Sequence, residues 1–352
     1  MKKIISLTLA LMLLLGLLAV SAIAEETTLV GALSYLNMSE DDEGTLGLAF
    51  RRVPVKILAL HGVLTGDSET QPSDHLTYQH YDSLNAMLLG LDSGEVKAIS
   101  VPYYTAKYLC STNSKVKLKR EYHPENAKGL SDWALARLCD GYSFMLKEEN
   151  TALRDEFDAQ IKAMKEDGTL QKLVDEYIIK ASEGGEAVAV SFEQFEGDPM
   201  KVGVTGDLPP MDYVAPDGSF AGFNTAVLAE IGKRMQRNIE LVQVDSIGRA
   251  LALSEGVVDV VFWTRGLSEE MVEERVANRG LSDEERAAKR AERLEAMTEE
   301  EKAIFGAAGE LTDDLFADLF AKLKDRDMPA GTIVTQPYFS DFPVLVTLKE
   351  AE

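Results

Sequence analysis

The sequence contains few of the residues from which enzyme and metal sites are usually built. Its 352 residues include only two cysteines and four histidines. We find no glycine-rich phosphate loop, no HExxH motif and no Gly-x-Ser-x-Gly motif. His75 and His80 share one polar stretch, but two ligands do not make a metal site. We therefore expect no enzymatic activity, no cofactor and no bound metal.

Basic residues are also scarce relative to acidic ones. Lysine and arginine together number 36, against 59 aspartates and glutamates, so the formal net charge is −23. A surface of this sign repels the phosphates of nucleic acid, which excludes nucleic acid as a partner. We interpret the acidity as a means of keeping the protein soluble.

Long apolar runs are confined to the first 24 residues. Lys2 and Lys3 precede this run, and the small residues Ala22-Ile23-Ala24 close it. This pattern is typical of a cleaved export signal, so we expect a periplasmic or extracellular protein. A retained transmembrane anchor is the alternative, although the run is barely long enough to span a bilayer.

The two cysteines of an exported chain raise the question of a disulfide. An oxidising compartment permits a bond between Cys110 and Cys139. Both cysteines follow a leucine in apolar surroundings, which is equally compatible with two buried free thiols. The sequence leaves the two alternatives open.

Predicted strands and helices alternate over residues 28–178 and again over 201–265, which indicates an α/β fold. Residues 181–200 are polar and contain glycine, and we interpret them as a linker. Residues 266–328 are rich in Ala, Glu, Lys and Arg, which predicts a solvated helical insertion. A hairpin that binds a partner is the alternative interpretation of this insertion.

The stretch from Lys201 has the features of a domain opening. A short strand, Val202 to Val204, leads into a polar loop, and Pro216-Asp217-Gly218 predicts a turn. A helix should follow, with Asn224 or Thr225 as its cap. The question is why such an opening stands after two hundred residues of other chain.

This stretch resembles the first lobe of the family 3 extracellular solute-binding proteins of ABC transporters, which have the type II periplasmic-binding fold. The resemblance is carried, in order, by Pro209-Pro210, Asp217-Gly218, Gly222-Phe223-Asn224, "LALSEGVVDVV" and "PYFSDFPVLV". The earlier stretches "YDSLNAMLLGLDSGEVKAISVPYYTAKYL" and "GYSFMLKEENTALRDEFDAQIKAMKEDGTLQKLVDEYI" are similar to that family's second lobe and closing segment. The end of the family's sequence therefore comes first here.

The resemblance implies a two-lobed α/β fold of type II that is circularly permuted and carries a helical insertion. Two truncated domains in tandem are the alternative. The expected parts are a signal peptide (1–24), lobe two (28–140), a hinge strand with closing helices that pack on lobe one (141–180), the linker (181–200), lobe one (201–265), the insertion (266–328) and a second hinge strand with the C-terminus (329–352).

Arg265 is the first candidate for the binding site. It follows the apolar strand 259–263, and open α/β sheets bind ligands at the carboxyl ends of their strands. Its guanidinium would bind a carboxylate through two hydrogen bonds. Trp263 would stack on the ligand. The alternatives are a surface arginine and a tryptophan packed in the core.

The resemblance adds further positions that would line the space between the lobes. They are Thr264, Asp207, Asn224, Ser39, Tyr103 and Tyr338. Asp207 could instead only fix a turn, and Asn224 could only cap a helix. Ser39 opens a predicted helix, whose free N–H groups favour an anion, although a plain helix start explains it equally.

The sequence departs from the family's amino-acid binders at three positions. Their arginine several residues beyond the strand end falls in "GLSEEM", their lobe-two aspartate is replaced by Pro102, and the aromatic expected after Pro210 is Met211. A standard α-amino acid is therefore not the expected ligand.

The function that the resemblance implies is capture of a small polar or anionic, amino-acid-like organic solute. The protein would be a monomer that delivers this solute to an ABC transporter permease, and it would meet the membrane only through that permease. The alternatives are an enzyme on the same fold, catalysing an elimination or cell-wall chemistry, and a ligand-sensing or scaffold protein.

Overall fold

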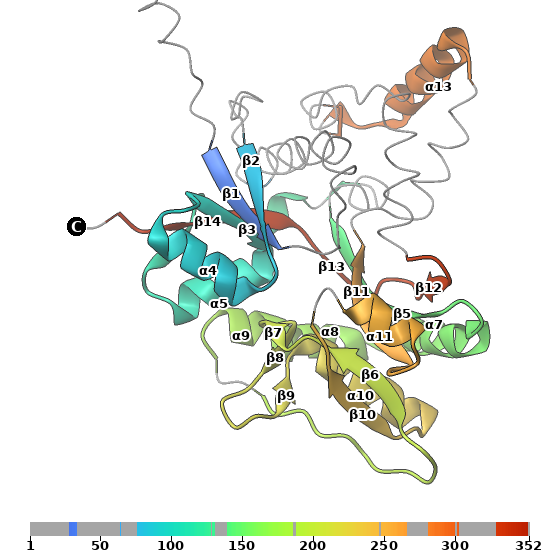
Figure 1. The fold of residues 1–352 in the computed structure, drawn as a ribbon. Coiled ribbons are helices and arrows are strands. Elements are labelled where there is room, and N and C mark those ends of the chain that lie inside the picture. Colours follow the sequence, from blue (N-terminus) through green and yellow to red (C-terminus); the bar gives the residue numbers. More distant parts are fainter. Residues whose placement is uncertain are drawn as a thin grey trace, which may run out of the picture.

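A computed structural model gives the fold of the chain (Figure 1). It describes Leu64 and residues 28–33, 76–127, 129–130, 139–185, 188–245, 248–265, 281–299, 301–302 and 329–350. The predicted signal peptide (1–24), Ser39 and most of the predicted insertion lie outside these residues. None of the described helices combines the length and apolarity needed to cross a bilayer.

The first sheet belongs to the part of the molecule that we call lobe two. Its strands, in order across the sheet, are β2 (Leu76–Tyr81), β1 (Thr28–Leu33), β3 (Ala98–Pro102), β14 (Pro343–Leu348) and β4 (Val116–Leu118). Helices α4 (Leu84–Ser93) and α5 (Tyr103–Thr112) pack on it. Strands β1, β2 and β3 are parallel, and β14 runs antiparallel to both β3 and β4.

The second sheet belongs to lobe one. Its strands, in order, are β10 (Ile239–Gln243), β6 (Met200–Val204), β11 (Val260–Arg265), β5 (Asp140–Lys147) and β12 (Thr332–Val334). Strands β10, β6 and β11 are parallel, and β5 is antiparallel to both β11 and β12. The two sheets therefore have the same strand order and the same pattern of directions.

Each sheet receives its fourth strand from a distant part of the chain. β14 follows lobe one in sequence but lies in the sheet of lobe two, and β5 follows lobe two but lies in the sheet of lobe one. Between them, β13 (Phe339–Asp341) pairs with the start of β5. The two predicted hinge strands, "YSFMLK" in β5 and "FPVLVT" in β14, do not pair with each other: "FPVLVT" pairs with β3 and β4, and the residues just before it pair with β5.

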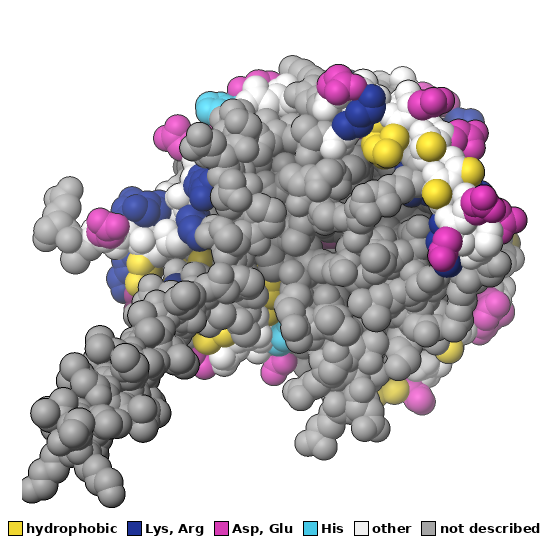
Figure 2. All heavy atoms as spheres, turned by 90° about the horizontal axis from the view of Figure 1, so that it is seen from above, with side chains coloured by type: hydrophobic (Ala, Val, Ile, Leu, Met, Phe, Trp, Pro, Cys, Tyr) yellow, Lys and Arg dark blue, Asp and Glu magenta, His cyan; other side chains and the backbone are white. Residues whose placement is uncertain are grey.

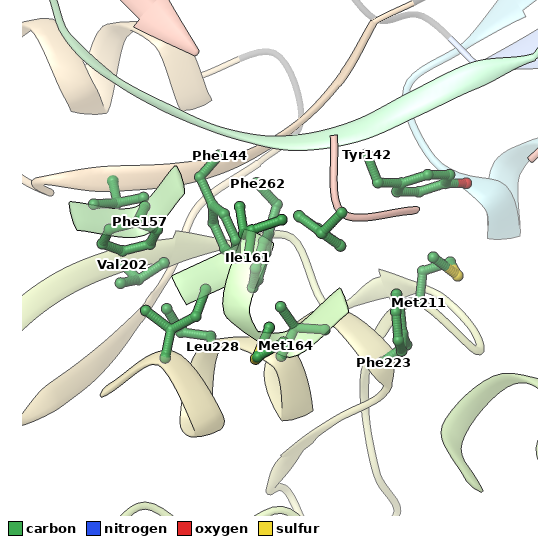
Figure 3. Close-up of a cluster of buried hydrophobic side chains, with 14 of the residues drawn as sticks. Tyr142, Phe144, Phe157, Ile161, Met164, Val202, Met211, Phe223, Leu228 and Phe262 are labelled. Carbon is green, nitrogen blue, oxygen red and sulfur yellow. The ribbon is translucent and has the colours of Figure 1, made fainter. Parts of the chain in front are cut away.

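The helices after β5 pack on lobe one. They are α7 (Thr151–Glu166), α8 (Thr169–Leu173) and the π-helical turn Val174–Ile179, whereas the short helix α9 (Lys180–Ser182) that follows them contacts α5 of lobe two. Phe157, Ile161 and Met164 of α7 share one face because they are spaced three and four residues apart. All three are fully buried among side chains of the lobe-one sheet and of helix α10 (Phe223–Met235) (Figure 3).

The loop after β6 forms a small sheet of its own, made of β7 (Asp207–Leu208), β8 (Asp212–Val214) and β9 (Phe220–Ala221). The predicted turn lies between β8 and β9, where Gly218 has a φ of 86°. Helix α10 (Phe223–Met235) begins at Gly222 instead of at a polar cap. The expected capping role of Asn224 or Thr225 is therefore wrong, since both residues lie inside the first turn.

The linker runs along lobe one. The amide of Phe195 donates to Oδ1 of Asn238 (2.6 Å), and Nδ2 of Asn238 donates to the carbonyls of Phe195 (2.6 Å) and Gly197 (2.8 Å). In the insertion, residues Asp283–Ala296 form helix α13, as their composition predicts, and it lies apart from both sheets (Figure 1). On the face shown in Figure 2, acidic side chains are interspersed with lysine and arginine.

Candidate functional site

The carboxyl edges of the two sheets are joined by the crossing strands. β13 ends at Asp341, which pairs with Asp140 at the start of β5. The next residue of β5, Gly141, pairs with Arg265 at the end of β11. Directly afterwards, β14 begins at Pro343, opposite Pro102 at the end of β3. Since ligands of open α/β sheets bind outside these carboxyl ends, the candidate site lies around this crossing.

A buried carboxylate organises the loop at the end of β6. Oδ2 of Asp212 accepts hydrogen bonds from the amide of Thr205 (2.9 Å) and from its hydroxyl (3.1 Å). Burial raises the pKa of Asp212, although these bonds and the charge of Arg249 act in the opposite direction. Oδ1 of Asp212 has no donor among the described residues. Sequence reasoning missed this residue, because nothing in its neighbours marks it as buried.

Asn224 and Tyr338, both predicted for the site, are brought together by the fold. The hydroxyl of Tyr338 donates to Oδ1 of Asn224 at 2.8 Å, and both side chains are buried. The backbone amide of Asn224 donates a hydrogen bond to the carbonyl of Met211 (2.8 Å). Burial, together with the charge of Asp212, raises the pKa of Tyr338 well above its ordinary value. Here Tyr338 is a neutral donor that fixes the orientation of Asn224.

The end of β11 carries the other predicted lobe-one residues. Trp263 is 4% exposed and packs with Met145, Val261 and other side chains on the second face of the sheet. Its ring also contacts the guanidinium carbon of Arg249, 5.1 Å from the ring centroid, while Nη1 of Arg249 donates to the carbonyl of Phe262 (2.9 Å). Trp263 therefore has the core position that the sequence left as the alternative.

The remaining predicted residues differ in their surroundings. Thr264 and Asp207 are partly exposed at the lobe-one edge. The backbone of Arg265 pairs with Gly141, next to the crossing, and its side chain lies outside the described part of the structure. Tyr103 is in lobe two, where its ring stacks on Phe342 with centroids 4.9 Å apart.

The two cysteines are not bonded to each other. Both side chains are partly buried, and burial raises the pKa of the Cys110 thiol. Of the two alternatives left open by the sequence, the structure therefore does not have the disulfide between Cys110 and Cys139.

Part of lobe one is similar to a known protein family. Residues 200–271, about a fifth of the chain, match the family model of bacterial extracellular solute-binding proteins, family 3. The predicted resemblance is confirmed over this segment, which starts at the opening strand and continues past β11. No curated protein matches the sequence significantly.

Solved structures align over most of the chain, but poorly. The periplasmic VFT2 domain of BvgS from Bordetella pertussis is 9% identical, with a TM-score of 0.35, over 92% of this chain and 80% of that one. An arginine-bound ancestral arginine-binding protein is 10% identical, with a TM-score of 0.34, over 93% and 85%. Arginine-bound ArgBP from T. maritima is 9% identical, with a TM-score of 0.33, over 92% and 89%. These TM-scores are too low for the alignments to bear on function.

Proposed function

We propose that this chain is an exported solute-binding protein that captures a small polar or anionic, amino-acid-like organic solute for an ABC transporter. The observation that carries the proposal is the crossing: two sheets of identical strand order are joined at their carboxyl edges by two strands. In such an arrangement the lobes can rotate about the crossing strands and close on a solute. The family match of residues 200–271 supports the same function.

The lobes already contact each other beyond the crossing. The rings of Tyr108 on α5 and Tyr213 on β8 lie 6.1 Å apart, and α4 contacts β7. A site between lobes in this position would be walled by tyrosines and by the polar groups of Thr205, Asp207 and Thr264. Aromatic walls with a few fixed polar groups are what small-solute sites require.

A thermal-shift screen against amino acids, organic acids and polyamines tests this function. A solute at a hundred times its dissociation constant should stabilise the native state by about 2.7 kcal/mol, which raises the melting temperature. A stabilising compound from one class, with related compounds inactive, is the expected result. If no compound from any class raises the melting temperature, the proposal fails.

Arg265 is proposed to bind the anionic group of that solute. Its backbone position at the carboxyl edge of β11, level with Gly141 of the crossing strand, supports this role. We expect Arg265→Ala to weaken binding by about 2–5 kcal/mol in calorimetry if the charge pair is desolvated. Lys162→Ala, on the exposed face of α7, is the control and should bind normally. Unchanged affinity in Arg265→Ala would contradict the assignment.

We also propose that the chain is a circular permutation of the family's architecture. Thr28 begins β1 and Leu348 ends β14, on either side of β3. The pairs Val30–Ala98 and Val346–Ile99 put these two ends at the same edge of the sheet. Two strand spacings separate them, or roughly 10 Å. A short loop would therefore restore the order in which lobe one comes first.

Relinking the chain tests the permutation. Glu350 is joined to Thr28 by about five Gly and Ser residues, since an extended residue spans roughly 3.3 Å, and new ends are made after Gly185. This protein should fold and unfold cooperatively like the original, because exposed loops tolerate new chain ends. The matched control has its new ends inside β6 and should not fold. If the variant with new ends after Gly185 also does not fold, the result counts against the permutation.

A further inference from the structure

The crossing strand changes sheets within three residues. Asp341 is the last residue of β13 and pairs with Asp140 in lobe one, and Pro343 is the first residue of β14 and pairs with Pro102 in lobe two. Only Phe342 lies between them. Any rotation of one lobe against the other must therefore bend the backbone at or next to Asp341.

The side chain of Asp341 nevertheless reaches into the other lobe. Its Oδ2 accepts a hydrogen bond from the amide of Tyr104 in the first turn of α5 (3.1 Å), and its Oδ1 accepts one from the amide of Phe342 (2.8 Å). The cap residue of α5 is Pro102, which makes no side-chain cap bond. Asp341 thus supplies, from the lobe-one strand, the capping carboxylate that the lobe-two helix lacks in its own sequence.

The surroundings of this carboxylate are apolar and acidic. Asp341 is 2% exposed, beside the stacked rings of Tyr103 and Phe342. The titratable groups that face it are Asp140 on β5 and the hydroxyls of Tyr103 and Tyr104 on α5. The charge of Glu125, in the 3-10 turn Pro124–Ala127, contributes to the raised pKa of Tyr103.

Two effects act on the protonation of Asp341. Burial, followed by the charge of Asp140, raises its pKa, while the backbone N–H groups of Tyr104, Phe342 and Tyr103 lower it. Burial prevails, and the pKa is about 7 instead of the ordinary 3.8. The contribution of Asp140 is the repulsion between like charges that face each other in an antiparallel strand pair.

We propose that Asp341 is a latch between the two lobes, and that its protonation state sets how readily the lobes separate. The bond from Asp341 to α5 has one partner on each side of the bend, so separation of the lobes has to stretch it and let water reach the carboxylate. A hydrated carboxylate has a pKa close to its ordinary value. The closed arrangement consequently binds a proton more tightly than the open one.

The direction of the pH effect follows from this difference. By linkage, protons favour the state that binds them more tightly, so acid favours the closed arrangement. Above about pH 7 the buried carboxylate is charged, and its burial next to Asp140 favours separation. This property goes beyond the proposed function and does not depend on which solute is bound.

Small-angle X-ray scattering of the solute-free full chain at pH 5.5 and pH 8.5 tests the latch. We expect the radius of gyration to be smaller at pH 5.5, with a transition midpoint near 7. Asp341→Asn keeps the shape of the side chain but cannot ionise, and it should be compact at both values. Asp217→Asn, in an exposed turn of lobe one, is the matched control and should keep the transition.

A second variant protects the test against failure of Asp341→Asn to fold. Asp140→Asn removes the opposing charge, so the midpoint of the transition should move to lower pH. The proposal is overturned if the wild-type radius is the same at both pH values. It is overturned equally if Asp341→Asn, once folded, keeps the transition, or if Asp140→Asn leaves the midpoint unchanged.

Discussion

Phe157→Ala is expected to destabilise the protein by about 3–5 kcal/mol in denaturant unfolding. Phe157 is fully buried, and its ring packs edge-on against Phe144 of the crossing strand β5, with centroids 5.1 Å apart. Figure 3 shows it close to Val202, and Ile161 belongs to the same buried cluster, so truncation leaves a cavity with walls on several elements. Most of the cost comes from this cavity, because a packed core closes it only in part.

The location of the loss is as informative as its size. The same buried cluster contains Val202 of β6 and Val260 of β11, whereas β1 and β3 belong to other clusters. Hydrogen exchange should therefore speed up in β6 and β11 and stay slow in β1 and β3. Lys162→Ala on the same helix is the control, since that side chain is 71% exposed, and it should change stability by less than about 0.5 kcal/mol. Equal losses in the two variants would show that α7 does not pack as described.

Gly222→Ala is expected to cost on the order of 3 kcal/mol. Gly222 has a φ of 108° and a ψ of 174°, a backbone conformation that is nearly exclusive to glycine. A Cβ atom there would lie 2.6 Å from the carbonyl oxygen of Met211 and 2.8 Å from that of Pro210. Both atoms are backbone and cannot move aside cheaply. The Met211 oxygen also accepts a hydrogen bond from the backbone amide of Asn224 (2.8 Å), and the Pro210 oxygen accepts one from that of Phe223 (3.0 Å). Movement of these oxygens away from a Cβ atom would therefore displace Asn224.

Gly218→Ala separates the clash from the backbone strain. Gly218 also has a positive φ, 86°, but apart from its chain neighbours no described residue has an atom within 4 Å of the position that a Cβ would take there. This variant should lose only the roughly 1–2 kcal/mol of a left-handed residue with a side chain. Chemical denaturation of both variants measures the difference. If Gly222→Ala is no less stable than Gly218→Ala, the contact with Pro210 and Met211 is not what fixes the start of α10.

Local pattern predicted most of the regular elements. Gly94 ends α4 with a φ of 79°, as its place after an apolar-periodic segment predicts. The Ala- and Glu-rich run predicted helix α13, which begins with a capping box at Ser282. These elements are predictable because the residues that start and stop them are neighbours in sequence.

The start of α10 was predicted incorrectly for a reason outside the local sequence. Asn224 and Thr225 are residues that favour a cap, but the first amides of this helix are accepted by the carbonyls of Pro210 and Met211. The helix therefore needs no side-chain cap, and the side chain of Asn224 instead accepts the hydrogen bond from the Tyr338 hydroxyl. Sequence reasoning paired neither residue with the other, because 114 positions separate them.

The sequence by itself determined the α/β class, the turn and strand that open lobe one, and the similarity of residues 200–271 to a solute-binding family. Only the tertiary structure decided which acids are buried and that Trp263 packs in the core. Asp212 and Asp341 look like ordinary loop aspartates in sequence, and 237 positions separate Asp341 from the amide of Tyr104 that it binds. Burial and charge pairing arise from contacts between segments far apart in the chain, whereas helix, strand and turn preferences act between neighbours.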